Sequence, residues 1–258
     1  MPPPYHAEYW NAFVNAGYQQ QQAVGDPPQQ WAQGLQNVPA GLPNMQQTRQ
    51  QVRQICIDPN SPELIGYIHV MAWGGQGDRF GHKTLAWQNM DQIIPKLQAL
   101  REGGLNHCQT YNLFAGENKV AGLGPSFFTK LIYFFTPEPQ PGQIGFYIMD
   151  QWTAKSVDLL TQQWVVRLQR SEKTSPGHNN KCGNYEAFCR EVEHIAAALE
   201  IGGVHTGDQV EQRLMSEGGH HAQLWRQHVR DNWPLHAPAG RYNRTAIANY
   251  TGVQQACL

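Results

Sequence analysis

The segment Pro125–Phe135 constrains the fold most, because it is apolar on nearly every side and carries a single lysine. Proline suits the first position of a helix, where its missing amide hydrogen costs nothing. A helix that is apolar all round is buried inside a domain. Lys130, its only charge, shares one helical face with Ser126 and Phe134. The sequence therefore predicts a buried helix that places one lysine inside the protein.

Helical periodicity continues through the rest of the chain from about Ser61, while the alternation typical of strands is scarce. Residues 144–149 are the best strand candidate, and this segment is short. We therefore expect a mostly α fold. The expected helices cover residues 62–73, 85–101, 125–135, 150–170, 184–200, 207–216 and 222–232, with shorter ones around 9–16 and 46–56. A short segment, residues 106–114, precedes the hairpin.

Glutamine and proline are concentrated in residues 1–60, with a glutamine run at 19–22 and a proline pair after Asp26. Polar, proline-containing stretches of this kind bury little apolar surface and are often irregular. We expect a partly irregular N-terminal segment over residues 1–60. Residues 61–258 are then expected to form a helical domain with a hairpin at 122–124.

The overall charge and the cysteines limit the class of protein. A formal net charge of −1 argues against a strongly basic nucleic-acid scaffold, although it does not exclude a local basic patch. No apolar run approaches the ~20 residues of a membrane helix, and the N-terminus shows no secretory signal. The five cysteines are scattered and odd in number, which indicates reduced thiols in a cytoplasmic protein. Cys182 and Cys189 lack the further ligands of an iron–sulfur or zinc site, so we expect no metal.

A glycine hairpin, Gly122-Leu123-Gly124, precedes the apolar helix. Glycines permit a tight turn, and the amides of such a turn can bind a phosphate at the start of the helix. Asp150 follows about twenty residues after Lys130, directly before another helical run. A desolvated amine with a carboxylate nearby can act as a nucleophile at a sugar carbon.

Both charged residues also have a purely structural interpretation. Lys130 could pack its stem in the core and extend its ammonium group to solvent. Asp150 could be a helix N-cap, a role that still allows its carboxylate to face a cleft. The hairpin beside the pair favours chemistry over structure.

The stretches GLGPSFFTK (residues 122–130) and YIMDQWTAKSV (residues 147–157) resemble the helix–hairpin–helix DNA glycosylases. The resemblance is specifically to a divergent bacterial branch of the 8-oxoguanine DNA glycosylases. It covers roughly residues 103–161 and extends loosely to the C-terminal helices. It implies two helical subdomains with a cleft between them. It also implies that the partner is double-stranded DNA with a damaged or modified base, and not a membrane.

The resemblance assigns roles to the two charged residues. In that family a lysine attacks C1′ of the damaged nucleotide and an aspartate assists, which corresponds to Lys130 and Asp150. The family's lysine usually lies two residues after the second hairpin glycine, a position held here by Ser126, so Lys130 is displaced by one helical turn. Lys155 is a weaker alternative nucleophile. The residues expected at the DNA backbone are Gly122, Leu123, Gly124 and Lys119.

Enzymes of this family flip the damaged nucleotide into a pocket, where aromatic side chains stack on the base and amides contact its edge. The candidates for these contacts are Trp73, Trp152, Trp225, Gln223 and Gln227, although tryptophans commonly pack in a core. Displacement of the base would leave an imine on the lysine, and β-elimination would then cut the strand without a cofactor. The choice of 8-oxoguanine comes from the resemblance alone.

Other functions fit the same residues. A non-catalytic helix–hairpin–helix DNA-binding module would need only the hairpin. A monofunctional glycosylase would use Asp150 to activate water. A component of a bacterial anti-phage defence system would use the glutamine-rich N-terminus to contact other proteins of that system. The joint presence of Lys130 and Asp150 favours the bifunctional enzyme.

Overall fold

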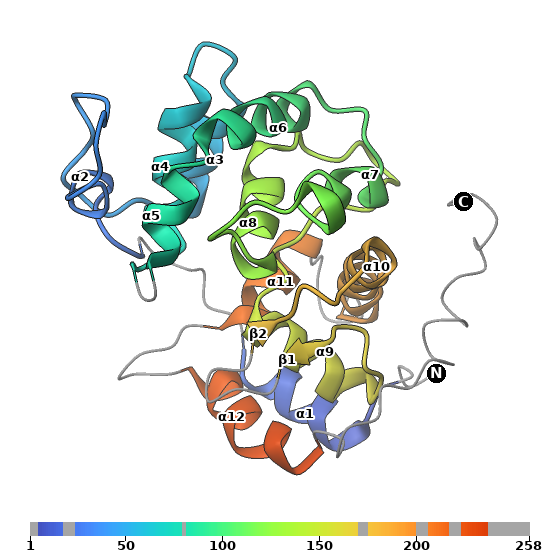
Figure 1. The fold of residues 1–258 in the computed structure, drawn as a ribbon. Coiled ribbons are helices and arrows are strands. Elements are labelled where there is room, and N and C mark those ends of the chain that lie inside the picture. Colours follow the sequence, from blue (N-terminus) through green and yellow to red (C-terminus); the bar gives the residue numbers. More distant parts are fainter. Residues whose placement is uncertain are drawn as a thin grey trace. The chain divides into compact units, whose positions relative to one another are not determined.

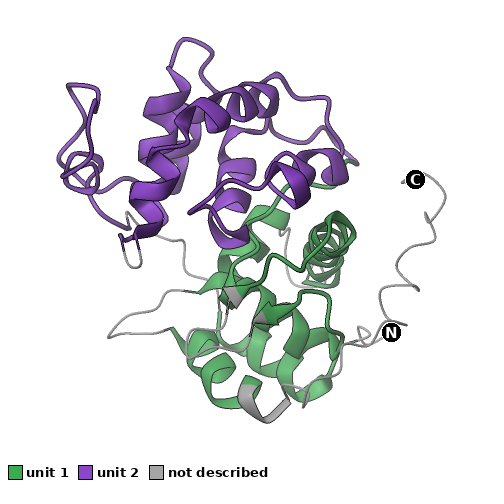
Figure 2. Ribbon diagram, in the orientation of Figure 1, with its two compact units in different colours: residues 1–20, 143–258 green, residues 21–142 purple. Residues whose placement is uncertain are grey.

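The computed structural model describes residues 5–17, 24–78, 81–169, 175–199, 206–216 and 223–236. The described chain is mostly helical, which confirms the expected fold class (Figure 1). It forms two compact units (Figure 2). Unit 1 comprises residues 1–20 and 143–258, and unit 2 comprises residues 21–142.

Unit 2 is built around α8 (Pro125–Phe135), the apolar helix that the sequence predicts (Figure 1). Phe128, Leu131 and Phe134 of this helix are completely buried. The helices that pack against α8 are α3 (Arg49–Ile57), α4 (Glu63–Trp73), α6 (Met90–Glu102) and α7 (His107–Asn112). The unit also contains α2 (Pro28–Trp31), α5 (His82–Trp87) and the short 3₁₀ helix η2 (Gly116–Asn118).

Unit 1 is built around α9 (Gln151–Thr161), whose inner residues Ala154, Val157 and Leu160 are completely buried. The helices that contact α9 are α1 (Ala7–Asn15), α10 (Cys182–Leu199), α11 (Gly207–Met215) and α12 (Leu224–His236). Two short antiparallel strands, β1 (Leu168–Gln169) and β2 (Ser175–Pro176), complete the unit.

Helices from residues 1–60 take part in both units. α1 contacts α9 and α12, whereas α3 contacts α4 and α8. The structure therefore divides the chain at residues 20 and 142, and the sequence suggests a boundary at residue 60. Residues 1–60 are polar overall, but a few of their apolar side chains are completely buried, among them Phe13 in α1 and Val52 in α3. These side chains join the helices of residues 1–60 to the two units.

The helix expected over residues 85–101 is two helices, α5 and α6. The break comes before α6, where Asn89 Nδ2 donates to the carbonyl oxygen of Leu85 over 2.7 Å and so satisfies the end of α5. Pro95 lies inside α6 and does not divide it.

The expectations on either side of Asp150 also need correction. Residues 144–149 do not form a strand: Tyr185 Oη donates to the carbonyl oxygen of Tyr147 over 3.0 Å, and Thr153 Oγ1 donates to that of Ile148 over 2.8 Å. Side-chain hydroxyl groups thus supply the hydrogen bonds that a neighbouring strand would otherwise donate to these carbonyl oxygens. The helix expected over residues 150–170 ends at Thr161, because Gln162 adopts a left-handed conformation with φ of 56°.

The cysteines differ from the expectation of five reduced thiols. Cys56 and Cys189 are buried free thiols, and burial raises the pKa of both. Cys108 is not a free thiol but part of a disulfide, and the same holds for Cys182. Cys257 lies outside the described residues. None of the helices in the described residues combines the length and hydropathy needed to span a bilayer.

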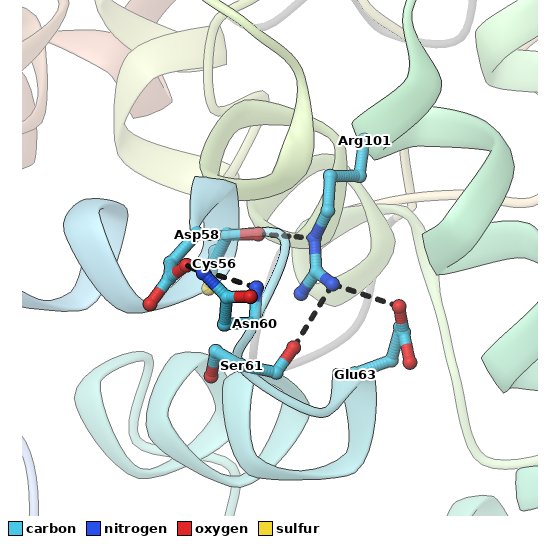
Figure 3. Close-up of polar contacts among 6 residues, drawn as sticks. All are labelled: Cys56, Asp58, Asn60, Ser61, Glu63 and Arg101. Atoms are coloured by element: carbon cyan, nitrogen blue, oxygen red, sulfur yellow. Dashed lines mark hydrogen bonds and ion pairs between the residues drawn. The ribbon is translucent and has the colours of Figure 1, made fainter.

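Arg101 of α6 holds the connection between α3 and α4 (Figure 3). Its Nε donates to the carbonyl oxygen of Cys56 over 2.8 Å, and its Nη1 donates to that of Ser61 over 2.9 Å. Nη1 also pairs with Glu63 Oε1 over 2.8 Å. Asp58 Oδ1 accepts from the backbone amide of Asn60 over 2.9 Å and closes the turn between the two helices. These contacts fix two of the helices that surround α8.

Candidate functional site

The hairpin before α8 packs directly on α5. Gly122 has φ of 80°, and a Cβ atom there would lie 2.2 Å from the carbonyl oxygen of His82 and 2.7 Å from the amide nitrogen of Ala86. Only glycine allows both this conformation and this approach. Gln76, which is almost completely buried, donates from Nε2 to the carbonyl oxygen of Gly122 over 3.3 Å. Sequence reasoning missed Gln76, since a glutamine between glycines carries no periodic signal.

The backbone amides of the hairpin differ in whether they already donate a hydrogen bond within the protein. The Leu123 amide donates to the carbonyl oxygen of Val120 over 3.2 Å, so it already has a partner. Gly124 is the N-cap of α8, and its amide makes no hydrogen bond with the described residues. The partial positive charge of a helix N-terminus adds to such a donor. Lys119 is exposed just before the turn. An anion at this hairpin would therefore contact the Gly124 amide and not that of Leu123.

Lys130 is buried in unit 2, with 7% of its surface exposed. Its stem lies beside Gly74, where an added Cβ would come within 2.8 Å of Lys130 Cδ. Its Nζ donates to the carbonyl oxygen of Ser126 over 3.1 Å and lies 5.0 Å from the centroid of the Phe127 ring. The ammonium group thus reaches back by one turn to the residue at which the resembled family carries its lysine.

Asp150 is the N-cap of α9 in unit 1. Its Oδ1 accepts from the amides of Trp152 over 2.7 Å and Thr153 over 3.0 Å, and Thr153 Oγ1 accepts from the Asp150 amide over 3.0 Å. Oδ2 makes no hydrogen bond with the described residues, and the side chain is partly exposed. The capping bonds therefore fix the orientation of the carboxylate through one of its two oxygens.

The structure brings Lys155 of α9 close to Asp150. Burial lowers the pKa of Lys155, the charge of Asp150 raises it, and the charge of Arg226 in α12 lowers it. Lys155 and Arg226 both lie against the ring of Trp152, with distances of 4.9 and 4.3 Å to its centroid. The surroundings of Asp150 in unit 1 are therefore cationic and aromatic.

Trp73 and Trp152, two of the expected pocket residues, belong to different units. Trp73 in unit 2 packs edge-on against Phe134 with ring centroids 5.0 Å apart, and its Nε1 is buried without a hydrogen-bond partner among the described residues. An unsatisfied buried donor is costly unless a ligand satisfies it. Trp152 is partly exposed beside Asp150. The guanidinium group of Arg49, 3.9 Å from the Tyr133 ring centroid and 5.8 Å from that of Trp73, is a neighbour that the sequence did not indicate.

The remaining pocket candidates have structural contacts. Trp225 is 1% exposed and donates from Nε1 to Ser156 Oγ over 2.9 Å, which makes it a core residue. Gln227 is exposed and donates to Asp231 one turn further along α12 over 3.1 Å. Gln223 is partly exposed and accepts from Ser216 Oγ over 3.1 Å. Within the described ranges, no group of three or more His, Cys, Asp and Glu side chains could hold a metal ion.

Comparison with known proteins gives one match. A model of the family described as "Putative 8-oxoguanine DNA glycosylase OGG-like protein" matches residues 17–215. This range includes the hairpin, Lys130 and Asp150 and ends at the last residue of α11. No curated protein matches the chain. No solved structure matches it either.

Proposed function

The chain belongs to this OGG-like family, and from that premise we propose that it is a DNA glycosylase with β-lyase activity on DNA that contains 8-oxoguanine. The placement in the helix–hairpin–helix superfamily is part of the same proposal. The observation that carries it is Lys130, a buried lysine whose Nζ is held at the first turn of α8, directly after the hairpin. A buried lysine in the first turns of a helix, directly after a turn that we expect to bind phosphate, is suited to attack a nucleotide.

In the proposed reaction the Lys130 amine forms a bond to C1′ of a flipped nucleotide, and the bond from C1′ to the base breaks. The base leaves with the electron pair and accepts a proton. Opening of the sugar places a proton on the ring oxygen and leaves an imine between C1′ and Nζ. Loss of a C2′ proton then expels the 3′ phosphate and cuts the strand. Asp150, with one carboxylate oxygen outside its cap, stabilises the positive charge that develops on the sugar.

The hairpin and the tryptophans supply positioning. The Gly124 amide and Lys119 contact the DNA backbone, which places the strand without reading its sequence. Trp73 and Trp152 are the proposed contacts of the flipped base, and the unsatisfied Trp73 Nε1 is a donor for an oxygen on its edge.

Borohydride trapping tests the proposal. A labelled duplex with one 8-oxoguanine opposite cytosine is incubated with the protein and borohydride, which reduces an imine to a stable adduct. We expect an adduct with the unmodified protein and none with Lys130→Ala. Lys96→Ala is the matched control, since Lys96 also lies against an aromatic ring of unit 2, 6.0 Å from the Phe114 centroid. An adduct that persists in Lys130→Ala would reject Lys130 as the nucleophile.

The other products separate the remaining functions. Base release without an adduct, lost in Asp150→Asn, would indicate a monofunctional glycosylase. Binding of the duplex without base release or adduct would indicate a DNA-binding module without catalysis.

A further inference from the structure

A cluster of cationic and aromatic side chains lies beside Asp150 in unit 1. Lys155 Nζ lies 4.9 Å from the ring centroid of Trp152 and 4.9 Å from that of Trp233, which belongs to α12. The Arg226 guanidinium lies 4.3 Å from the Trp152 centroid. All four of these side chains are partly exposed. A ligand from solvent can therefore reach the cluster.

The two cations of the cluster differ in their partners. The Arg226 guanidinium donates from Nε and Nη2 to the carbonyl oxygen of Met215, over 3.1 and 2.6 Å, and also to that of Ser216. It therefore ties α12 to the end of α11. Lys155 Nζ lies between the two indole rings, and the described residues place neither a hydrogen-bond acceptor nor a carboxylate within bonding distance of it. An ammonium group carries only donors, so these donors remain for a ligand.

The local charge favours an anion as that ligand. Lys155 and Arg226 are close enough for the charge of Arg226 to lower the pKa of Lys155, after the larger effect of burial. Asp150 is the carboxylate whose charge opposes them, and its Oδ1 is used by the amides of α9. Half-buried cations interact more strongly with an anion than exposed ones, because water screens them less.

We propose that Lys155 binds a backbone phosphate of the DNA, next to the nucleotide on which Asp150 acts. The inference rests on the proposed function, since it takes DNA as the ligand. A phosphate flanks every sugar of the strand, so a cation one turn from Asp150 is placed to hold it. The indole rings of Trp152 and Trp233 keep the long stem of Lys155 in place, which reduces the entropy lost on binding. This role differs from that of a nucleophile, because a phosphate contact keeps the amine protonated.

Binding of a duplex with a tetrahydrofuran abasic analogue, which cannot be cleaved, tests the inference. Lys155→Met keeps an unbranched side chain between the two rings and removes the charge, whereas Lys155→Arg keeps a cation. We expect Lys155→Met to weaken binding about tenfold, because one charge-assisted hydrogen bond is lost. The slope of log K against log salt should become shallower by about 1, as for one lost phosphate contact. Lys155→Arg should retain most of the affinity and most of the salt slope of the unmodified protein.

Lys181→Met is the matched control, because Lys181 is an exposed lysine of the same unit. We expect it to change the affinity less than Lys155→Met does. Unchanged affinity and salt slope in Lys155→Met, with normal binding by the unmodified protein, would overturn this inference alone. A borohydride adduct on Lys155 itself would also overturn it, because the amine would then bond to the sugar. Absence of binding by the unmodified protein would overturn the proposed function and this inference together.

Discussion

At the scale of single residues, Gly122 determines how closely the hairpin packs on α5. Alanine there combines a left-handed backbone, with φ of 80°, and a Cβ atom 2.2 Å from the His82 carbonyl oxygen. We expect Gly122→Ala to lower the free energy of unfolding by about 3 kcal/mol, the sum of backbone strain and overpacking. Gly116→Ala is the control, because Gly116 has φ of 63° and open space around it. Its expected cost is about 1 kcal/mol. If urea denaturation showed equal losses of stability in Gly122→Ala and Gly116→Ala, the close packing of Gly122 on α5 would not contribute to stability.

Arg101 is a second residue whose substitution has a defined cost. Arg101→Ala removes the bonds to the Cys56 and Ser61 carbonyl oxygens and to Glu63, and it leaves these partly buried groups without a donor. We expect the free energy of unfolding to fall by about 3 kcal/mol. Arg190→Ala breaks an ion pair with Glu186 that is more exposed and should cost about 0.5 kcal/mol. Denaturation curves of the two variants check the difference, and a loss below about 1 kcal/mol in Arg101→Ala would contradict this account.

At the scale of elements, the N-terminus of α9 combines a structural and a proposed chemical role in Asp150. Asn caps a helix as well as Asp does, whereas Ala does not. We therefore expect Asp150→Asn to retain stability within a few tenths of a kcal/mol and to lose base release. Asp150→Ala should lose base release and should also lower the free energy of unfolding by about 1 kcal/mol. Melting temperatures and base release from the 8-oxoguanine duplex measure the two effects.

Thr206→Ala controls for the loss of a helix cap. Thr206 forms the capping box of α11 in the same unit, so its loss should also cost about 1 kcal/mol. It should leave base release unchanged. Full activity in Asp150→Asn would show that the carboxylate charge has no catalytic role.

At the scale of the whole molecule, the stability of the two units should depend differently on pH, because one buried titratable group in each unit contributes with opposite sign. In unit 2, burial lowers the pKa of His69 to about 4, and its Nδ1 is within hydrogen-bonding reach of Gln47 Oε1. The unfolded chain takes up a proton near pH 6.5 and the folded unit does not. The stability from His69 is therefore complete above pH 6.5 and is lost as pH falls towards 4. The loss at pH 4.5 is about 2.5 kcal/mol.

Hydrogen exchange of α4 amides at pH 7 and 4.5, corrected for the intrinsic rates, measures this loss. His69→Gln should remove most of the pH dependence, because glutamine does not titrate. If the variant loses as much protection as the unmodified protein, another group causes the acid sensitivity.

In unit 1, burial raises the pKa of Asp158, although amides from the following loop, Val165 among them, donate to it. Its Oδ2 is buried without a hydrogen-bond partner among the described residues. The folded unit holds this proton at a pH where the unfolded chain has released it. Its contribution to stability is thus present at low pH and is lost as pH rises through the folded pKa. We expect α9 amides to lose less protection than α4 amides on acidification, and Asp158→Asn to reduce that advantage.

The sequence alone predicted where most helices begin, because the signals at a helix start are local. Pro125 at the first position and the apolar residues after it predict α8 with its observed bounds. Asp150 is the N-cap that its position before a helical run predicts. The side chain of Asn89 and the conformation of Gln162 end two helices without a strong sequence signal, and there the predicted bounds fail.

The sequence by itself determined the mostly α fold, the buried helix that carries Lys130 and the cap position of Asp150, since periodicity, proline and capping preferences act within one or two helical turns. Only the tertiary structure decided which groups have partners. It placed Trp225 in the core and set Lys155 between rings from α9 and α12. Burial and hydrogen bonding of a side chain depend on residues far away in the chain, which no local pattern specifies.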